Sequence, residues 1–326
     1  MAKLSRRDFM KTGLAAAGAA GVSRAPLPGS VKGATGGELA TLIDTRKCIA
    51  CGACVDACRY SNAEKFPEPE KPLPGMFPER VKVEDWSDKR DVRDRLTPYN
   101  WLYVDTVWVE HDGVEHEVNI PRRCMHCQNP PCADLCPFGA ARKQNDGITR
   151  IDADICLGGA KCKIVCPWHV PQRQTGVGLY KKLPTTRFAG NGVMFKCDRC
   201  YDRLDEGGLP ACIEECPEAV QKIGPRDRIM SEARRLAEEE GAYLYGMDEN
   251  GGTNTVYVSA VPFEIINRAL DKGPGRPHMD KVANAMDTEE NLTMALLIAP
   301  FAGLAAAALR IFGFATPGGG KEEQDV

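Results

Sequence analysis

The chain has 326 residues, a formal net charge of −3 and a hydrophobic content of 43%, a composition that can bury a sizeable core in one or two domains. This near-neutral charge balance gives no sign of nucleic-acid binding. The outlying number is 15 cysteines, all of which fall into four tight groups. The function is therefore expected to depend on clustered thiols.

The N-terminus has the features of an export signal. Arg6 and Arg7 precede an apolar, Ala- and Gly-rich run over residues 12–22, which resembles a twin-arginine signal. Residues 1–34 are therefore predicted to be signal and linker, and the folded body is expected on the periplasmic side of the cytoplasmic membrane. A twin-arginine signal also implies export after cofactor insertion. Pro26 follows the small-residue cleavage candidate, so the sequence leaves processing open.

The first cysteine motif reads CIACGACVDAC, which is the ligand spacing of bacterial ferredoxins. Three thiolates have to converge on three corners of one cubane, so the chain must curl tightly and turn its amides toward the cluster sulfurs. Two-residue gaps and small residues such as Gly52 and Ala53 allow this. In such motifs the last cysteine ligates the other cluster of a pair.

Two connecting elements follow this motif. Residues 60–99 are Pro-rich and charged, which is typical of a surface loop. Residues 103–120 alternate around His111, Asp112 and Gly113, which predicts a β-hairpin.

Three more cysteine motifs lie further along the chain. Pro137, Pro167 and Pro217 each follow the last cysteine of a motif, as in bacterial ferredoxins. Interleaved clusters need an even number of motifs, and four are present. With the first motif, the cysteines are Cys48, Cys51, Cys54 and Cys58; Cys124, Cys127, Cys132 and Cys136; Cys156, Cys162 and Cys166; and Cys197, Cys200, Cys212 and Cys216.

The third motif lacks one thiol, because Gly159 stands where its second cysteine belongs. This loss removes the ligand for one corner iron, which predicts a 3Fe-4S cluster here and 4Fe-4S clusters at the other three sites. A 4Fe-4S cluster capped by water or hydroxide is the open alternative. The intact cysteines around Gly159 argue against a decayed motif.

The C-terminal third carries three further elements. Residues 226–240 have the composition of a solvated helix, and residues 255–261 are typical of a strand. Residues 292–309 are charge-free and almost wholly apolar, and a bilayer-spanning helix needs about 20 such residues. A transmembrane helix is therefore predicted over 292–314, followed by a tail over 315–326. A buried core helix is the alternative, but apolarity on every face favours the membrane.

Disulfides and zinc are the alternatives to iron as partners of clustered cysteines. Disulfide scaffolds are usually small, whereas a chain of 326 residues needs no staples to form a core. Paired CxxC units also make structural zinc sites. The triple spacing of the first motif and the cysteine–proline units favour iron–sulfur clusters. No nucleotide loop, flavin motif or catalytic triad is recognisable, so no catalytic residue is predicted.

With CMHCQNPPCADLCP and LDEGGLPACIEECP, the four motifs resemble the polyferredoxin subunits of the dimethyl-sulfoxide-reductase type. The export signal, the GGTNTVYVSAVPFE segment and the apolar C-terminus resemble most closely the periplasmic iron–sulfur subunit of nickel–iron hydrogenase-2. The subunit of the high-molecular-weight cytochrome complex is similar too. The resemblance implies an α+β fold with two interleaved ferredoxin-like domains, loop insertions and a C-terminal transmembrane helix.

The domain boundaries follow from this resemblance. The first ferredoxin-like domain would be split, and its two parts would flank a central domain that holds the second and third motifs. The expected ranges are 35–123 for the first half with its insertion, 124–190 for the central domain, 191–270 for the completing half with a helix and a strand, and 271–291 for a linker.

The resemblance also implies the ligands of four clusters, because the first motif works with the fourth and the second with the third. The implied ligands are Cys48, Cys51, Cys54 and Cys216 for cluster 1; Cys58, Cys197, Cys200 and Cys212 for cluster 2; Cys124, Cys127, Cys132 and Cys166 for cluster 3; and Cys136, Cys156 and Cys162 for cluster 4, the predicted 3Fe-4S cluster.

The function implied is electron transfer without catalysis. The four clusters would relay electrons between a periplasmic catalytic subunit and a membrane subunit that carries quinone or haem. A hydrogenase is the first choice of partner. A formate dehydrogenase, another molybdopterin enzyme or a multihaem cytochrome complex is the alternative. His126, His169 and Trp168 lie beside cysteines. The histidines are expected to be packing or hydrogen-bonding residues and are assigned no functional role, and Trp168 is expected to cover a cluster, with a place on an electron path as the alternative.

Overall fold

A computed structural model describes residues 37–73, 82–182 and 192–311. The predicted signal over 1–34 and the predicted tail over 315–326 lie outside these residues. The last three residues of the predicted transmembrane helix, 312–314, lie outside them as well.

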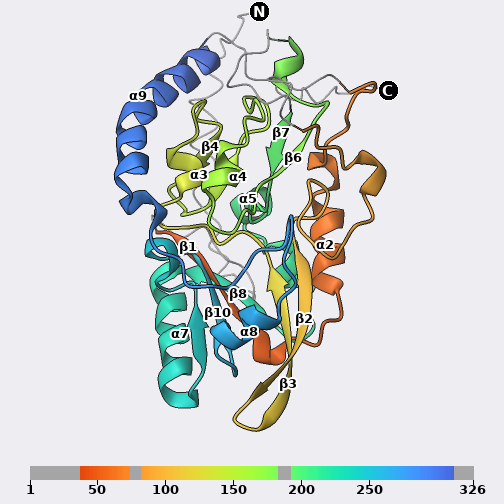
Figure 1. Cartoon of the computed structure of the whole chain (residues 1–326), viewed down its shortest axis with the longest axis vertical. Helices are drawn as coiled ribbons and strands as arrows, with labels where there is room; N and C mark the ends of the chain where they lie inside the picture. Colours follow the sequence, from red (N-terminus) through yellow and green to blue (C-terminus); the bar gives the residue numbers. More distant parts are fainter. Residues whose placement is uncertain (1–36, 74–81, 183–191, 312–326) are drawn as a thin grey trace, which may run out of the picture. The chain divides into compact units, whose positions relative to one another are not determined.

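A four-stranded sheet joins the two ends of the cysteine-bearing region. Its strands are β8 (Gln221–Pro225), β1 (Leu39–Asp44), β10 (Thr255–Ser259) and β9 (Tyr243–Tyr245), in that spatial order. β1 pairs antiparallel with β8 and parallel with β10, so segments far apart in sequence lie side by side (Figure 1). The predicted strand over 255–261 is confirmed in β10. All six residues of β1 are buried, as expected of a central strand.

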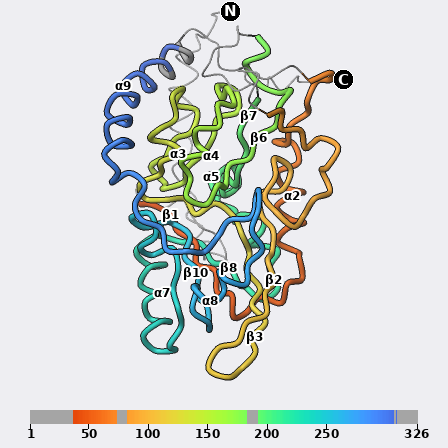
Figure 2. The backbone as a smooth tube through the Cα atoms, viewed as in Figure 1, coloured from red at the N-terminus to blue at the C-terminus, as the bar shows by residue number. Residues whose placement is uncertain are grey.

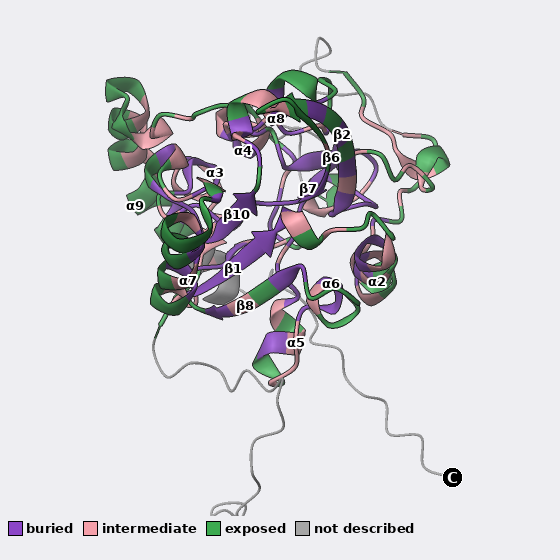
Figure 3. Cartoon of the chain, turned by 90° about the horizontal axis from the view of Figure 1, so that it is seen from below, coloured by how far each residue is buried: buried purple, intermediate pink, exposed green. Residues whose placement is uncertain are grey.

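Helix α7 (Arg226–Glu240) covers one face of this sheet. Its residues Ile229, Ala233 and Leu236 are buried against Leu42 and Val256 of the strands, because apolar side chains three and four positions apart share one helix face. The predicted helix is confirmed, but only its outer face is exposed (Figure 3).

The predicted hairpin is also confirmed. Strands β2 (Tyr103–His111) and β3 (Val114–Arg122) pair antiparallel around Asp112 and Gly113. Both turn residues have positive φ, 52° and 74°, the conformation that a tight two-residue turn requires. Helix α8 (Phe263–Ala269) packs against β2.

The surface loop predicted over 60–99 is right only in part. Helix α2 (Ala53–Ser61) runs into this segment, which also contains the 3₁₀ turns η2 (Ala63–Lys65) and η3 (Ser87–Lys89). The prediction is wrong at its end, where Leu96 and Tyr99 are buried. The Tyr99 hydroxyl donates to the Pro67 carbonyl at 2.9 Å, which satisfies its polar end inside the core.

The cysteine motifs form short helices joined by small two-stranded sheets. Helix α2 packs against α6 (Ala211–Glu214), and α3 (Pro131–Asp134) packs against α4 (Lys161–Val165). The first motif therefore contacts the fourth. The second contacts the third, and Figure 2 shows α3 and α4 side by side. The remaining elements are α5 (Tyr201–Asp205), η1 (Thr45–Lys47), η4 (Leu179–Lys182), η5 (Glu249–Gly251) and η6 (Ala285–Asp287), and the pairs β4 (Ala141–Lys143) with β5 (Thr149–Ile151) and β6 (Gln172–Gln174) with β7 (Val193–Phe195). Helices and strands are mixed, as the α+β prediction requires.

Helix α9 (Glu289–Ile311) is the last described element. Within the described residues, none of the helices is both long and apolar enough to cross a membrane, so the transmembrane helix predicted over 292–314 is not found. Ala302 of α9 is buried, and its carbonyl oxygen would lie 3.1 Å from a Cβ atom placed on Gly139. Helix α9 therefore packs closely on the segment that follows Cys136.

Replacing Leu236 by alanine is expected to lower the free energy of unfolding by about 2–5 kcal/mol, because it leaves a cavity between α7 and the sheet. Thermal unfolding followed by circular dichroism measures this effect. Glu238→Ala, on the exposed face of the same helix, is the matched control and should leave the midpoint almost unchanged. Equal midpoints for both variants would contradict the packing of α7.

Candidate metal centres

The thiols of the first and fourth motifs lie together in two groups. Cys54 has Cys48, Cys51 and Cys216 among its electrostatic neighbours, and Cys58 has Cys197, Cys200 and Cys212. The first thiol group is defined as Cys48, Cys51, Cys54 and Cys216, and the second as Cys58, Cys197, Cys200 and Cys212.

The thiols of the second and third motifs form two further groups. Cys127 is close to Cys124, Cys132 and Cys166, and Cys162 is close to Cys156 and Cys136. The third thiol group is defined as Cys124, Cys127, Cys132 and Cys166, and the fourth as Cys136, Cys156 and Cys162. The structure thus brings together the thiols that the family resemblance joined. Their role as cluster ligands stays a prediction.

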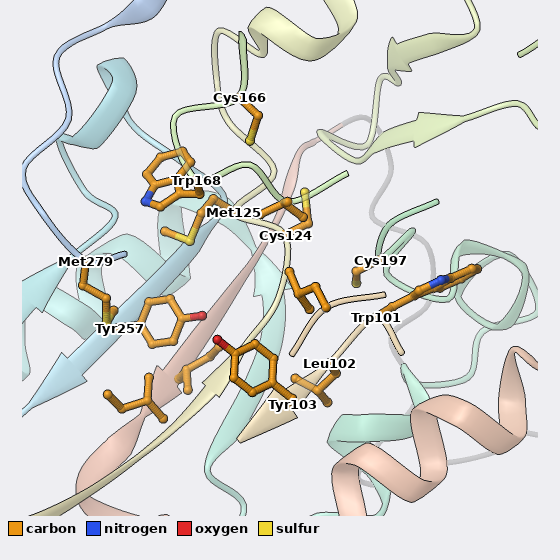
Figure 4. Close-up of a cluster of buried hydrophobic side chains, with 14 of the residues drawn as sticks. Trp101, Leu102, Tyr103, Cys124, Met125, Cys166, Trp168, Cys197, Tyr257 and Met279 are labelled. Carbon is orange, nitrogen blue, oxygen red and sulfur yellow. The ribbon is translucent and has the colours of Figure 1, made fainter. Parts of the chain in front are cut away.

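The four groups follow one another in a row. Cys54 of the first group interacts with Cys212 of the second. Cys197 of the second interacts with Cys124 of the third. Cys132 of the third is a neighbour of Cys162 in the fourth. Figure 4 shows the middle of this row, where Cys124, Cys166 and Cys197 share one core with Trp101 and Trp168.

The ends of the row differ from its middle in exposure. All thiols of the second and third groups are buried. In the first group Cys51 is exposed, and Cys48 and Cys216 are partly exposed. In the fourth group Cys136 is partly exposed, and Gly159 of its motif is exposed. The row therefore reaches the surface at its two ends.

A left-handed residue recurs two positions after the first cysteine of every motif. These residues are Ala50, His126, Gly158 and Arg199, with φ of 53°, 49°, 64° and 61°. Such φ values are unfavourable for residues other than glycine, and their recurrence at functional sites is common. The kink turns backbone amides toward the sulfur: the Arg199 amide donates to Cys197 Sγ at 3.4 Å. The predicted curl of the chain is confirmed.

A second kink follows the cysteine–proline units. Gly139, His169 and Ala219, each three residues after the last cysteine of its motif, have φ of 60°, 50° and 47°. Amides beyond the kink donate back to the thiols, from Ala141 to Cys136 Sγ at 3.5 Å and from Val220 to Cys216 Sγ at 3.4 Å. The prolines stop the helix, so the chain can fold back on its own sulfur.

A small cavity lies at the first thiol group, and the four thiols of that group line it together with Gly52, Val104 and Pro121. A cavity with four thiols in its wall fits the donor set of an iron–sulfur cluster. Among His, Cys, Asp and Glu side chains of the described ranges, no three stand close enough together to bind one metal ion.

Burial, strengthened by neighbouring thiols, raises the pKa of ten of the cysteines, which are Cys48, Cys54, Cys58, Cys127, Cys132, Cys156, Cys162, Cys166, Cys197 and Cys200. The pKa of Cys54 rises to about 12 and that of Cys156 and Cys166 to about 11. Without metal these thiols are protonated at neutral pH. Because metals bind the thiolate, metal binding must displace their protons.

Three polar residues that sequence analysis did not identify lie beside the thiols. The Arg123 guanidinium donates from Nη1 to Cys212 Sγ at 3.2 Å. Asn62 Nδ2 lies 3.8 Å from the sulfurs of both Cys58 and Cys200. Lys196 is buried beside the second and third groups. Arg123 and Lys196 each directly precede the first cysteine of a motif, which is the one sequence signal that could have identified them.

The aromatic and histidine residues beside the cysteines are held by hydrogen bonds within the protein. Trp168 Nε1 donates to the Tyr245 hydroxyl at 2.8 Å. The Thr149 amide donates to His126 Nδ1 at 3.2 Å, and His169 Nδ1 lies 2.9 Å from the Lys163 carbonyl oxygen. The two histidine contacts are consistent with the packing or hydrogen-bonding roles expected for these residues.

Comparison with known families identifies the metal chemistry. Residues 47–140 and residues 116–226 each match a family described as a 4Fe-4S dicluster domain. Residues 3–23 match the twin-arginine translocation pathway signal sequence, which supports export to the periplasm.

Among curated proteins, the hydrogenase-2 operon protein HybA of Escherichia coli O157:H7 is 30% identical over 312 residues, covering 81% of this chain and 83% of HybA. The chain belongs to the HybA family. A protein of Nitratidesulfovibrio vulgaris is 32% identical and covers 80% of the chain and 65% of that protein. The B subunit of anaerobic dimethyl sulfoxide reductase from Escherichia coli K12 is 35% identical over 60% of the chain and 77% of that subunit.

This HybA-family chain is an iron–sulfur electron-transfer subunit with several 4Fe-4S clusters, as the two dicluster matches and the relatives together indicate. The buried charges fit such cofactors. Arg123 is buried, and its Nε and Nη2 atoms have no hydrogen-bond partner in the described part of the chain. An unpaired buried cation costs several kcal/mol, and a negatively charged cluster would supply the missing partner.

Binding of ferrous ion by the metal-free HybA-family chain at pH 7 is expected to release about one proton from each ligating thiol whose pKa is raised, because the raised pKa keeps these thiols protonated. The apparent iron affinity should rise from pH 7 to pH 9, because the proton concentration that competes with iron falls while the thiols stay below their pKa. An anaerobic pH-stat titration with ferrous ion measures both effects, with sulfide left out because hydrosulfide would release protons of its own on entering a cluster. Iron uptake without proton release at pH 7 would contradict the raised pKa values.

Proposed function

We propose that the chain relays single electrons through four clusters between a periplasmic catalytic subunit and a membrane subunit that carries quinone or haem. A hydrogenase is the favoured catalytic partner, because HybA is a hydrogenase-2 operon protein that matches most of the chain. The bound clusters supply the one-electron chemistry. The chain's own residues hold, space and insulate them.

We assign one cluster to each thiol group. The first, second and third groups each offer four cysteines, and the fourth offers three. This assignment accounts for all 15 cysteines of the chain. It is supported by the neighbourhoods of Cys54, Cys58, Cys127 and Cys162, and by the cavity at the first group. The two interleaved ferredoxin-like domains follow from the same pairing of motifs.

The observation that best supports the proposal is that the row of thiol groups is buried in its middle and exposed at its two ends. A relay has to accept electrons at one end, deliver them at the other and keep water away between them. The second and third groups are buried, whereas the first group has the exposed Cys51 and the fourth has the exposed Gly159 loop. The two ends are therefore where partner subunits would approach.

We assign the membrane partner to the fourth group. A groove beside Cys136 is closed on its other side by Ala299, Ala302 and Gly303 of α9. Helix α9 also exposes apolar side chains, among them Leu296 and Phe301, each 70% exposed. An apolar surface of this kind suits contact with another apolar protein surface. The first group would then face the catalytic partner.

A molybdopterin oxidoreductase is the second candidate partner, because the dimethyl sulfoxide reductase B subunit is 35% identical over 200 residues. That match covers only 60% of this chain, whereas the match to HybA covers 81%. The larger coverage favours the hydrogenase.

Purifying the native complex from membranes and identifying its subunits tests the proposal. We expect a nickel–iron hydrogenase to co-purify, with hydrogen reducing clusters that electron paramagnetic resonance detects. A molybdopterin subunit would favour the second candidate, and a multihaem cytochrome would favour a redox complex without a dehydrogenase. A chain that holds zinc and no iron would rule out electron transfer altogether.

The cluster of the fourth group is proposed to be 3Fe-4S, because Gly159 offers no ligand for the fourth iron. Two adjacent glycines in this loop differ in their constraints. A Cβ atom on Gly158 would lie 2.5 Å from the Gly192 carbonyl oxygen, so a side chain does not fit there. Gly159 is exposed, which makes it the suitable position for restoring a thiol.

Gly159→Cys is expected to abolish the 3Fe-4S signal of the oxidised protein and to replace it by an additional 4Fe-4S signal on reduction. Low-temperature electron paramagnetic resonance on the purified complex measures this change. Gly159→Ala, which adds a side chain without a thiol, is the matched control and should keep the 3Fe-4S signal. If the native protein lacks that signal, a 4Fe-4S cluster capped by water or hydroxide takes its place.

A further inference from the structure

Two buried cations lie where the two halves of the relay meet. One half consists of the first and second thiol groups, and the other consists of the third and fourth. Arg123 is 2% exposed and Lys196 is 5% exposed. Arg123 directly precedes the third thiol group in sequence, yet its side chain turns to Cys212 of the second. Lys196 directly precedes Cys197 of the second group, and its electrostatic neighbours include Cys124 of the third. Each cation thus links thiols from both halves.

The hydrogen-bond partner of the Arg123 side chain is a sulfur atom and not a carboxylate. Its Nη1 atom donates to Cys212 Sγ at 3.2 Å, while Nε and Nη2 are buried without partners in the described part of the chain. The electrostatic neighbours of Arg123 include Cys197 as well as Cys212, and a guanidinium is not deprotonated in proteins. The side chain therefore stays charged.

Lys196 has the same character. Its ammonium donates to the Thr149 carbonyl oxygen and, at 3.1 Å, to the Cys197 carbonyl oxygen. The electrostatic neighbours of its side chain are Cys124 and Cys132 of the third group, Cys197 of the second, and Asp198. The two carbonyls satisfy donors but carry no net negative charge.

Other buried arginines have different partners. Arg199 donates to the carbonyls of Leu39 and Asn254 and to the Thr255 hydroxyl. Arg122 has the carboxylate of Asp105 at 3.7 Å. Like Arg199 and unlike Arg122, Arg123 and Lys196 have no carboxylate of the described residues within 4.0 Å of their side-chain nitrogens. Their charge is available to the thiol groups.

We propose that Arg123 and Lys196 are charge-compensating residues that stabilise the reduced state of the clusters at the second and third thiol groups. The inference rests on the proposed function, since it needs clusters at these groups. The added electron stays on the cluster, both cations keep their protons, and no bond forms or breaks.

The physical reason is the burial of the middle of the row. Adding a negative charge in a low-dielectric interior is unfavourable, and it is more unfavourable at the buried second and third groups than at the exposed ends. Without compensation the middle clusters would have lower potentials and would impede transfer. A fixed cation offsets this penalty, because charge and burial are the levers that set cluster potentials. The two cations would thus bring the reduction potentials of the middle clusters closer to those of the clusters at the ends.

The contacts predict which cluster each cation affects. Arg123 touches Cys212, so its removal should lower the potential of one cluster, that of the second group. Lys196 has neighbours in both groups, so its removal should lower two potentials, one from each half of the chain. This difference cannot arise from a general loss of stability.

The test is a redox titration of the whole purified complex, followed by electron paramagnetic resonance, with the variants Arg123→Met and Lys196→Met. We expect the reduction equilibrium of the affected clusters to change at least tenfold, which is about 59 mV for one electron. Arg123→Lys and Lys196→Arg keep the charge and should stay close to the native potentials. Lys47→Met is the matched control, because Lys47 also precedes the first cysteine of a motif but is 49% exposed and lies 3.7 Å from Asp44.

Unchanged potentials in both methionine variants would overturn the inference while leaving the electron-transfer function intact, since the clusters would still be seen to titrate. Loss of iron from the methionine variants alone would support a need for positive charge at these positions. Loss of iron from the charge-conserving variants as well would overturn it, because packing would then be the role of both residues. Failure of the proposed function is distinguishable, because the native protein itself would then lack iron.

Discussion

The hydrogen bonds that hold β1 between β8 and β10 fix the first cysteine motif beside the fourth. Ile43 is paired with Gln221, and the Asp44 amide donates to the Val220 carbonyl at 2.8 Å. Asp44 comes four residues before Cys48, and Val220 four residues after Cys216. Thiols separated by most of the chain therefore meet in one group, and every later property of the row depends on this pairing.

The same backbone that closes the groups also prepares them for a charged cofactor. The left-handed residues after the first cysteine of each motif, such as Ala50 and Arg199, aim amides at sulfur. Arg123 and Lys196 add full positive charges at the buried centre. Amide dipoles and cations both stabilise negative charge, so they favour the thiolate over the protonated thiol and would favour a reduced cluster over an oxidised one. The strained backbone and the buried cations therefore act in the same direction.

The cysteine spacing made the sulfur chemistry predictable, because the distance between ligands along a tight curl is a local property. The hairpin around Gly113, the helix over 226–240 and the strand of Thr255 were predictable for the same reason, since turn residues and apolar periodicity act over a few positions. The burial of Leu96 and Tyr99 was not predictable, because the loop-like composition of their segment does not reveal which other segments pack against it. The expected membrane-spanning helix was not found among the described residues.

By itself the sequence determined that four cysteine motifs are present, that one of them lacks a ligand at Gly159, and that the chain carries an export signal. Only the tertiary structure decided that the thiols meet in a row with buried middle and exposed ends, and that Arg123 turns away from its own motif toward Cys212. The reason is physical. Spacing is encoded between near neighbours, whereas exposure and electrostatic partnership arise from contacts between segments that meet only when the chain folds.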